Sequence, residues 1–479
     1  MLSRKAVIEE VSSWAIEAKE EDNDRYFYHF QDVDTIERGL KNYVIGRKGT
    51  GKTAIAEYIN NKSDYNVFSK ILSFKNFPFN ILYDLNDPNY TSPNQYITIW
   101  EFVIYNSICS MMANNNAVHQ KSGVDLKAIF NVSIEKALSK SIKEITKPGF
   151  ALEIFGASVG LTPGQQVDGV YSWRDKSDSI SNFVKENIDD STYYIMFDAL
   201  DEDYKDVLEP DRKQRYFELL VGLFKAVQNV RFFAQECGAK IIPVIFLRDD
   251  IFDLCRDPDK NKWMDRSVEL KWDVNALSSL IAFRITRAGD PSSDVHNFRG
   301  AWNSLFTTDR ITLNKKYKRS EDLFRFMLRS TFHRPRDVIS YVRSCAHIAK
   351  EQGVELISTT IIKDADESHS AYMRREVIDE LYPIIDDIGE VLDIFSEMRK
   401  QIFSLAEFSE MYEQMYKSKD AKRTLGPTDI LKLLYHFNVV GNITTANHQV
   451  FAYNSHKKSF NVRENICIHR GLLKSLHIL

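Results

Sequence analysis

Residues 46–53 read Gly46-Arg47-Lys48-Gly49-Thr50-Gly51-Lys52-Thr53, which fits the pattern G-x-x-x-x-G-K-[ST]. The β-type apolar run 43–45 precedes this segment, and the helix-compatible residues 54–59 follow it. Glycines let the backbone wrap phosphate oxygens, and the N-terminus of a helix adds oriented N–H donors. The segment therefore predicts a loop of eight residues that binds a nucleotide. The alternative is a glycine-rich surface turn.

Within this loop, we expect Lys52 to reach the β- and γ-phosphates and the Thr53 hydroxyl to ligate Mg²⁺. A second apolar run, 193–197, is typical of a strand buried in a parallel sheet and ends in Asp198-Ala199-Leu200-Asp201-Glu202-Asp203. Asp198 is the acid that we predict to hold Mg²⁺, an ion that such an acid usually contacts through a water molecule. Glu202 is the first candidate for the catalytic base and Asp201 the second, because either could orient and deprotonate an attacking water.

Two further segments offer candidate contacts to a γ-phosphate. The apolar run 241–247 ends in Arg248, whose planar fork binds phosphate well, although it could instead pair with Asp249 or Asp250. The segment 333–337 opens an amphipathic helix, and arginines in a first helical turn oppose the helix dipole. We favour Arg336, or failing that Arg334, as a phosphate sensor; a salt bridge to a local acid is the alternative.

Composition excludes several classes of protein. The chain has 479 residues, which corresponds to two to four domains of roughly 100–200 residues. No apolar run approaches the roughly 18–20 residues of a membrane span, so we expect no membrane contact. The five cysteines are scattered without a Cys-x-x-Cys pair, which argues against a disulfide framework or a zinc knuckle. We therefore expect a cytoplasmic protein.

The C-terminal segment is basic. From residue 417 onward ten basic residues face three acidic ones, so this tail carries +7 and the remainder −11. Helical patterns at 377–398, 405–416 and 427–440, followed by β-type runs at 449–453 and 459–468, outline a winged helix-turn-helix. Lys432, Lys457 and Lys458 are candidate contacts to nucleic-acid phosphates. The third helix is largely apolar and offers few groups for base edges, so such a module could equally dock on its own body.

The residues also resemble a known family. The run 193–202 resembles the Walker B of STAND ATPases, NACHT-type signalling ATPases included. The loop 46–53, the Phe-Leu-Arg-x-Asp strand end and the Arg-Pro-Arg-Asp motif are similar to a bacterial group of AAA-related P-loop ATPases, often labelled DNA-repair or antiphage-defence ATPases. The end of the chain, 451–476, resembles the winged helix of such proteins. The resemblance spans about residues 25–479, and the separation of 146 positions between Lys52 and Asp198 implies a sizeable insertion.

The resemblance implies an α/β fold, with a P-loop NTPase parallel sheet (ASCE/AAA-like), a helical lid and a C-terminal winged-helix domain. We expect residues 1–40 to form a helical segment packed on the core, 41–290 the core with an insertion at about 80–180, 291–370 the lid and 371–479 the winged helix.

The implied activity is that of a slow ATPase using ATP and Mg²⁺. It would act as a switch in a homo-oligomer, completed by an arginine finger that the sequence does not identify. The switch would control a separate effector or sensor protein in antiphage defence. The alternatives are a DNA-binding ATPase in repair, replication initiation or plasmid maintenance, and a nucleotide-binding scaffold without turnover.

Overall fold

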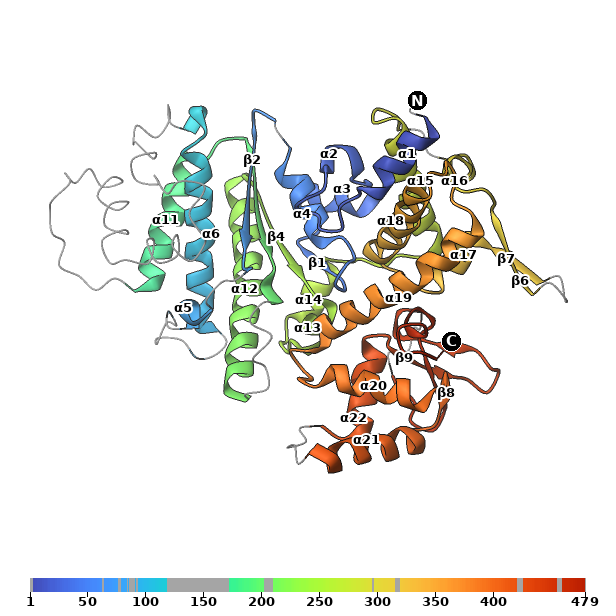
Figure 1. Cartoon of the computed structure of the whole chain (residues 1–479). Helices are drawn as coiled ribbons and strands as arrows, with labels where there is room; N and C mark the ends of the chain where they lie inside the picture. The colour runs from blue at the N-terminus through green and yellow to red at the C-terminus, as the bar shows by residue number, and fades with distance from the viewer. Residues whose placement is uncertain are drawn as a thin grey trace. The chain divides into compact units, whose positions relative to one another are not determined.

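The computed structural model describes residues 3–62, 64–75, 79–83, 85, 91, 94–118, 172–201, 210–294, 297–314, 319–419, 425–454 and 459–478 (Figure 1). The chain divides into two compact units. The core unit is His29–Lys271, and the lid–winged-helix unit combines Met1–Tyr28 with Trp272–Leu479.

A parallel five-stranded sheet forms the centre of the core unit. In spatial order its strands are β2 (Val67–Ser73), β3 (Thr192–Asp198), β4 (Lys240–Leu247), β1 (Tyr43–Ile45) and β5 (Ser267–Glu269). Strands β1, β3 and β4 are apolar and almost wholly buried, as expected where helices cover both faces of a parallel sheet. The order places β4 between β1 and β3, so the carboxyl ends of all three strands meet at one edge. The predicted α/β class with a P-loop NTPase sheet is confirmed.

Helices pack around this sheet. They are α3 (Gln31–Glu37), α4 (Lys52–Asn60), α5 (Asn80–Tyr83), α6 (Ile97–Met112), α11 (Trp173–Asn187), α12 (Pro210–Cys237), α13 (Asp249–Leu254) and α14 (Lys260–Asp265). Helix α6 lies against α11 and α12 (Figure 1) and is buried along nearly its whole length. Its Trp100 packs edge-on against Phe197 of β3 and donates a hydrogen bond to the Leu219 carbonyl. This part of the expected insertion therefore belongs to the core, while residues 119–171 lie outside the described residues.

Residues 1–28 belong to the lid–winged-helix unit. We had expected residues 1–40 to pack on the core instead. Helix α1 (Arg4–Ser12) lies on α15 (Val274–Gly289), α16 (Phe298–Leu305) and α18 (Pro335–Glu351). The buried Arg284 pairs with Glu21 at 2.6 Å and stacks on Trp14. Arg25 donates to the carbonyl oxygens at 287 and 288. These contacts to α15 are the physical reason for the difference.

The lid contains more than helices. Between α16 and α17 (Leu323–Leu328) an antiparallel hairpin is formed by β6 (Arg310–Asn314) and β7 (Arg319–Asp322). Figure 1 shows this hairpin projecting away from the helices of its unit.

The C-terminal domain combines three helices with a small sheet, as predicted for a winged helix, but the predicted third helix 427–440 ends at His436 and a strand begins at Val440. Its helices are α20 (Ile388–Met398), α21 (Leu405–Lys419) and α22 (Pro427–His436), and its strands are β8 (Ile402–Phe403), β9 (Val440–Ile443), β10 (Gln449–Val450) and β11 (Asn465–Ile468). The strands form an antiparallel sheet in the order β10-β9-β11-β8. The predicted helix 377–398 is interrupted: α19 (Thr359–Leu381) ends before Pro383, which cannot continue a helical hydrogen-bond ladder, and α20 begins at Ile388.

Helix α19 joins two hydrophobic cores. Ile361 and Ile362 belong to the core of the lid, whereas Met373 and Val377 belong to the core of the winged helix. One uninterrupted helix therefore connects the lid to the winged helix. Among the described residues no helix is both long and apolar enough to span a membrane.

Candidate nucleotide-binding site

The loop 46–53 leaves β1 and leads directly into α4. Gly49 and Gly51 have φ of 81° and 100°, a left-handed conformation that glycine adopts without the cost of a β-carbon. A Cβ at Gly46 would lie 2.6 Å from Thr50 Oγ1 and 3.1 Å from Leu270 Cβ. The glycines predicted from the motif are thus required by the loop's own geometry.

Helix α4 begins without a side-chain cap, because its N-cap residue is Gly51. Its first turn contains no acidic residue and instead contains Lys52, whose charge opposes the helix dipole. Lys52 Nζ donates to the carbonyl oxygens of Gly46 and Arg47 at 2.7 and 2.9 Å. Burial lowers the pKa of Lys52, and nearby Asp201 opposes that shift. An uncapped helix end beside a buried ammonium group fits a bound phosphate.

The Thr53 hydroxyl donates a hydrogen bond of 3.0 Å to Asp198 Oδ2, so the two predicted Mg²⁺ ligands are in contact. Asp198 ends β3 and is 5% exposed. Its backbone carbonyl accepts a hydrogen bond from the Phe74 amide, which fixes the end of the strand. A hydroxyl and a carboxylate oxygen are hard donors of the kind that Mg²⁺ prefers, so these residues fit that ion.

Arg248 follows β4 and lies among carboxylates. Its Nε and Nη2 atoms bind Asp250 at 3.0 and 2.6 Å, and its Nη1 atom lies 3.5 Å from Asp201. The charges of Arg248, Asp201 and Asp198 all act on Lys52. The pairing with Asp250 that the sequence left open is therefore present, and the same guanidinium lies beside a candidate catalytic acid.

The residue after Asp198 has an unusual backbone. Ala199 has φ of 58°, which is left-handed and costs a residue with a β-carbon roughly 1–2 kcal/mol. The turn is held by Tyr216, whose buried hydroxyl donates to the Leu200 carbonyl at 3.0 Å. Sequence analysis missed Tyr216, because an aromatic residue in an amphipathic helix carries no signal of this contact. Strain of this kind is often found at functional sites.

Three predicted residues remain. Glu202 is outside the described residues. Arg336, in the first turn of α18, belongs to the lid–winged-helix unit, where it pairs with Glu17 at 3.2 Å and Glu376 at 3.5 Å. Arg334 is 1% exposed and binds Asp337 and Glu380, so the salt-bridge alternative describes its state.

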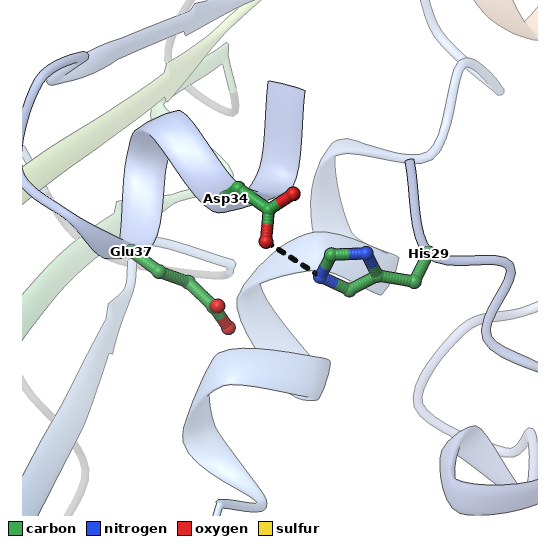
Figure 2. A group of neighbouring side chains, drawn as sticks. All are labelled: His29, Asp34 and Glu37. Atoms are coloured by element: carbon green, nitrogen blue, oxygen red, sulfur yellow. Dashed lines mark ion pairs between the residues drawn. The ribbon is translucent and has the colours of Figure 1, made fainter. Parts of the chain in front are cut away.

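A second group of polar side chains lies on the core unit before the loop. Figure 2 shows the His29 imidazole facing Asp34, with Glu37 beside them. The distance from His29 Nε2 to Asp34 Oδ1 is 3.7 Å. These groups could hold a cation by distance alone. Lys62 Nζ already lies 2.5 Å from Glu37, so a protein cation neutralises part of the cluster.

Of the three lysines predicted to contact nucleic-acid phosphates, the structure describes Lys432. Lys432 is exposed and pairs with Asp429 at 3.0 Å on the same helix, α22. The apolar side of α22, including Ile430, Leu431 and Leu434, is buried in the winged-helix core. Lys457 and Lys458 lie outside the described residues.

Comparisons with known proteins give remote matches. A family model described as the FunZ-associated C-terminal helical domain matches residues 275–378. The transposon gamma-delta 80.3 kDa protein of Escherichia coli (strain K12) is 23% identical over 463 residues. The match covers 91% of this chain but only 62% of that protein's length.

Solved structures also show a remote likeness. The Aeropyrum pernix ORC2 protein (ADPNP-ADP complexes) matches with a TM-score of 0.40 and 11% identity, covering 93% of this chain and 92% of that chain. The Aeropyrum pernix ORC1 protein in complex with DNA matches with a TM-score of 0.36 and 11% identity, covering 93% of this chain and 89% of that chain. Cdc6p from Pyrobaculum aerophilum matches with a TM-score of 0.32 and 10% identity, covering 98% of this chain and 96% of that chain. At these TM-scores the fold assignment rests on the sheet order and loop described above.

Proposed function

We propose that the chain is a Mg²⁺-dependent ATPase that works as a nucleotide-controlled switch. The observation that carries this proposal is the contact between Thr53 and Asp198, which joins the loop after β1 to the acid at the end of β3. Around this pair lie Lys52, Asp201 and Arg248. This combination of phosphate-binding backbone, ammonium group and oxygen ligands is what hydrolysis of a nucleoside triphosphate requires.

Each residue has a proposed task. The N–H groups of residues 46–53 and the Lys52 ammonium bind phosphate oxygens, while Thr53 and Asp198 would hold Mg²⁺, which neutralises phosphate charge. Asp201 or Glu202 orients the attacking water and accepts its proton. Arg248, now bound to Asp250, senses the γ-phosphate by exchanging carboxylate oxygens for phosphate oxygens.

The switch depends on the γ-phosphate, because ATP has this group and ADP lacks it. A ligand shifts a conformational equilibrium only through contacts that differ between the two states. Arg336 is the proposed sensor on the lid, since its carboxylate partners Glu17 and Glu376 could be exchanged for phosphate. Helix α19 then carries lid movement to the winged helix, whose core shares that helix.

The finer parts of the proposal rest on the family resemblance described under Sequence analysis. They are assembly into a homo-oligomer, with an arginine finger from a neighbouring copy, and control of a separate effector or sensor protein in antiphage defence. Pull-down of partner proteins from phage-infected and uninfected bacterial cells tests this part. Partners retained equally by the wild-type protein and by Lys52→Ala would contradict nucleotide control.

ATP turnover tests the activity directly. We expect Lys52→Ala to lower the hydrolysis rate at least about 100-fold, because it removes the cation that contacts the transferred phosphate. Lys185→Ala on α11 is the matched control, since Lys185 is exposed on the same unit and far from β1 in sequence. Unchanged turnover in Lys52→Ala would contradict the site, and equal loss in Lys185→Ala would indicate a general defect.

A DNA-dependent ATPase is the second candidate. The winged-helix topology and the +7 charge of the tail from residue 417 favour it. The curated relative is, by its name, a transposon protein, which also suits a role on DNA. We expect double-stranded DNA to stimulate turnover several-fold at low salt if this candidate holds, with the effect lost at higher salt. The absence of stimulation would favour a protein partner.

A further inference from the structure

A cavity of about 500 Å³ lies inside the lid–winged-helix unit, away from the nucleotide loop in the sequence. From the lid it is lined by Arg329 and His333, which lie between α17 and α18. From the winged helix it is lined by Tyr453 and Arg470, with Gln449 of β10 beside them. This volume falls in the range of small-molecule sites, about 300–1,000 Å³.

The charge of the cavity is positive. Arg329 and Arg470 line it, and no carboxylate is among the described residues that do so. Arg329 also pairs with Glu321 at 2.5 Å, outside the lining, so an anion in the cavity would share this guanidinium with Glu321. Arg470 Nε is buried and has no hydrogen-bond partner among the described residues, while its guanidinium lies over Phe326. Burial lowers the pKa of Arg470, and the like charge of Arg329 lowers it further. Two neighbouring guanidinium groups, one with an unsatisfied donor, form a site to which an anion can bind.

One wall of the cavity is aromatic. The His333 ring lies 4.7 Å from the Tyr453 ring, and Phe451 is nearly parallel to Tyr453, at an interplanar angle of 7°. Burial lowers the pKa of His333, so its ring is neutral at neutral pH and adds a flat surface rather than charge. His333 also has φ of 54°, a left-handed conformation that a residue with a β-carbon rarely adopts.

We propose that this cavity binds a nucleotide, held by its phosphate on Arg329 and Arg470 and by its base against the ring of Tyr453. A phosphate presents planar pairs of oxygens that match a guanidinium fork, and aromatic rings stack on any base. The cavity is larger than a lone phosphate requires, which is why the ligand carries a ring. The nucleotide is either free or one unit of a single-stranded nucleic acid, and this site is separate from the loop 46–53.

The test uses full-length chains that all contain Lys52→Ala, which removes binding at the loop. Calorimetry measures the affinity for three probes: inorganic phosphate, CMP and a single-stranded oligonucleotide of five deoxycytidines. CMP or the oligonucleotide should bind, and Arg470→Gln and Arg329→Gln should each weaken binding about tenfold or more, because each loses charge-assisted hydrogen bonds. Arg375→Gln on α19 is the matched control, since Arg375 is exposed and does not line the cavity.

The outcomes are distinct. Similar affinities for CMP and the oligonucleotide identify a free nucleotide as the ligand, whereas much tighter binding of the oligonucleotide identifies a strand. Affinities unchanged by both glutamine variants, or binding of phosphate as tight as that of CMP, would overturn the proposal, as would the absence of binding by every probe. A melting curve shows whether Arg470→Gln folds. If it does not, Arg329→Gln alone decides the test, because the Arg329 side chain is 45% exposed and its replacement should leave the fold intact.

Discussion

Gly46 has no room for a side chain, in contrast to Gly51, where a Cβ would meet no atom within 4 Å. A Cβ at Gly46 would lie 2.6 Å from the Thr50 hydroxyl, which itself donates to the Arg47 carbonyl within the loop. We expect Gly46→Ala to displace the loop and to weaken ATP binding at least about tenfold, a cost in the range of an overpacked site. Equilibrium binding of a fluorescent ATP analogue measures this.

The matched control is Gly389→Ala, because a Cβ at Gly389 meets no atom within 4 Å and the residue lies in helix α20. We expect this variant to bind ATP normally and to gain up to about 1 kcal/mol of stability from helix propensity. Weakened ATP binding in both variants would contradict a specific role for Gly46.

Arg334 and Arg336 are two residues apart but have different environments. Arg334 is buried with Asp337 and Glu380, so Arg334→Ala leaves buried carboxylates unpaired and should cost about 3–5 kcal/mol of unfolding free energy. Arg336 is 17% exposed and pairs with the exposed Glu17 and the largely buried Glu376, so Arg336→Ala should cost about 1–2 kcal/mol, less than Arg334→Ala, while lowering ATP turnover. Urea unfolding and turnover assays measure both effects. Normal turnover in a folded Arg336→Ala protein would exclude it as a sensor.

At this scale, sequence motifs predict which residue types should lie together. The contact of Thr53 with Asp198 follows from two motifs whose strands end at one sheet edge. The burial of Arg334 could not be predicted, because its partner Glu380 lies 46 residues away on another helix. The same limit applies to Tyr216, whose hydroxyl supports the turn after Asp198.

Secondary-structure elements could be predicted where their hydrophobic pattern was long and regular. The apolar runs of β1, β3 and β4 identified those strands and, with them, the edge that carries the site. Strand β5 was missed because it has three residues, of which only Val268 is buried. Helix α6 lies in the segment that was assigned to an insertion, since the distance between two motifs in the sequence does not show which intervening segment packs on the sheet.

The end of the chain is fitted closely to the lid. A Cβ on Gly471 would lie 2.3 Å from the Ser330 carbonyl oxygen, and the neighbouring Ser475 amide donates to Ser370 of α19. We expect Gly471→Ala to cost about 1–3 kcal/mol, because backbone must shift to admit the methyl group. Urea unfolding and protease sensitivity of the winged helix measure the effect. A variant as stable and protease-resistant as wild type would show that this contact does not hold the domain.

At the scale of the molecule, the division into units was the least predictable feature. The assignment of residues 1–28 to the lid depends on Arg284 and Glu21, which are distant in sequence. Hydrophobic periodicity predicts that a helix such as α1 buries one face, but it does not identify the surface that covers it.

Stability should fall in mild acid because two histidines, His369 fully buried and His333 half-buried, are held in a neutral state. Burial lowers the pKa of His333 and His369, so the folded chain binds fewer protons than the unfolded chain below pH of about 6.5. The unfolding free energy should therefore decrease from pH 7 to pH 5, by up to about 1.4 kcal/mol per pH unit for each histidine.

His369→Gln should reduce this pH dependence, since glutamine does not titrate and can still donate to the Ser330 carbonyl that His369 contacts. His347→Gln is the control, because His347 is 61% exposed. Urea unfolding at several pH values measures the slopes. Identical slopes for wild type and His369→Gln would show that His369 does not control acid sensitivity.

The central claim is that the loop and Asp198 form one Mg²⁺-dependent nucleotide site. The most direct measurement is ATP affinity with Mg²⁺ and with EDTA, for wild type and Asp198→Asn. We predict that Mg²⁺ tightens ATP binding to wild type at least about fivefold, a typical coupling between two ligands, and leaves Asp198→Asn nearly unchanged. Equal tightening in both proteins would contradict the claim, because the ion would then bind without the acid that β3 places beside Thr53.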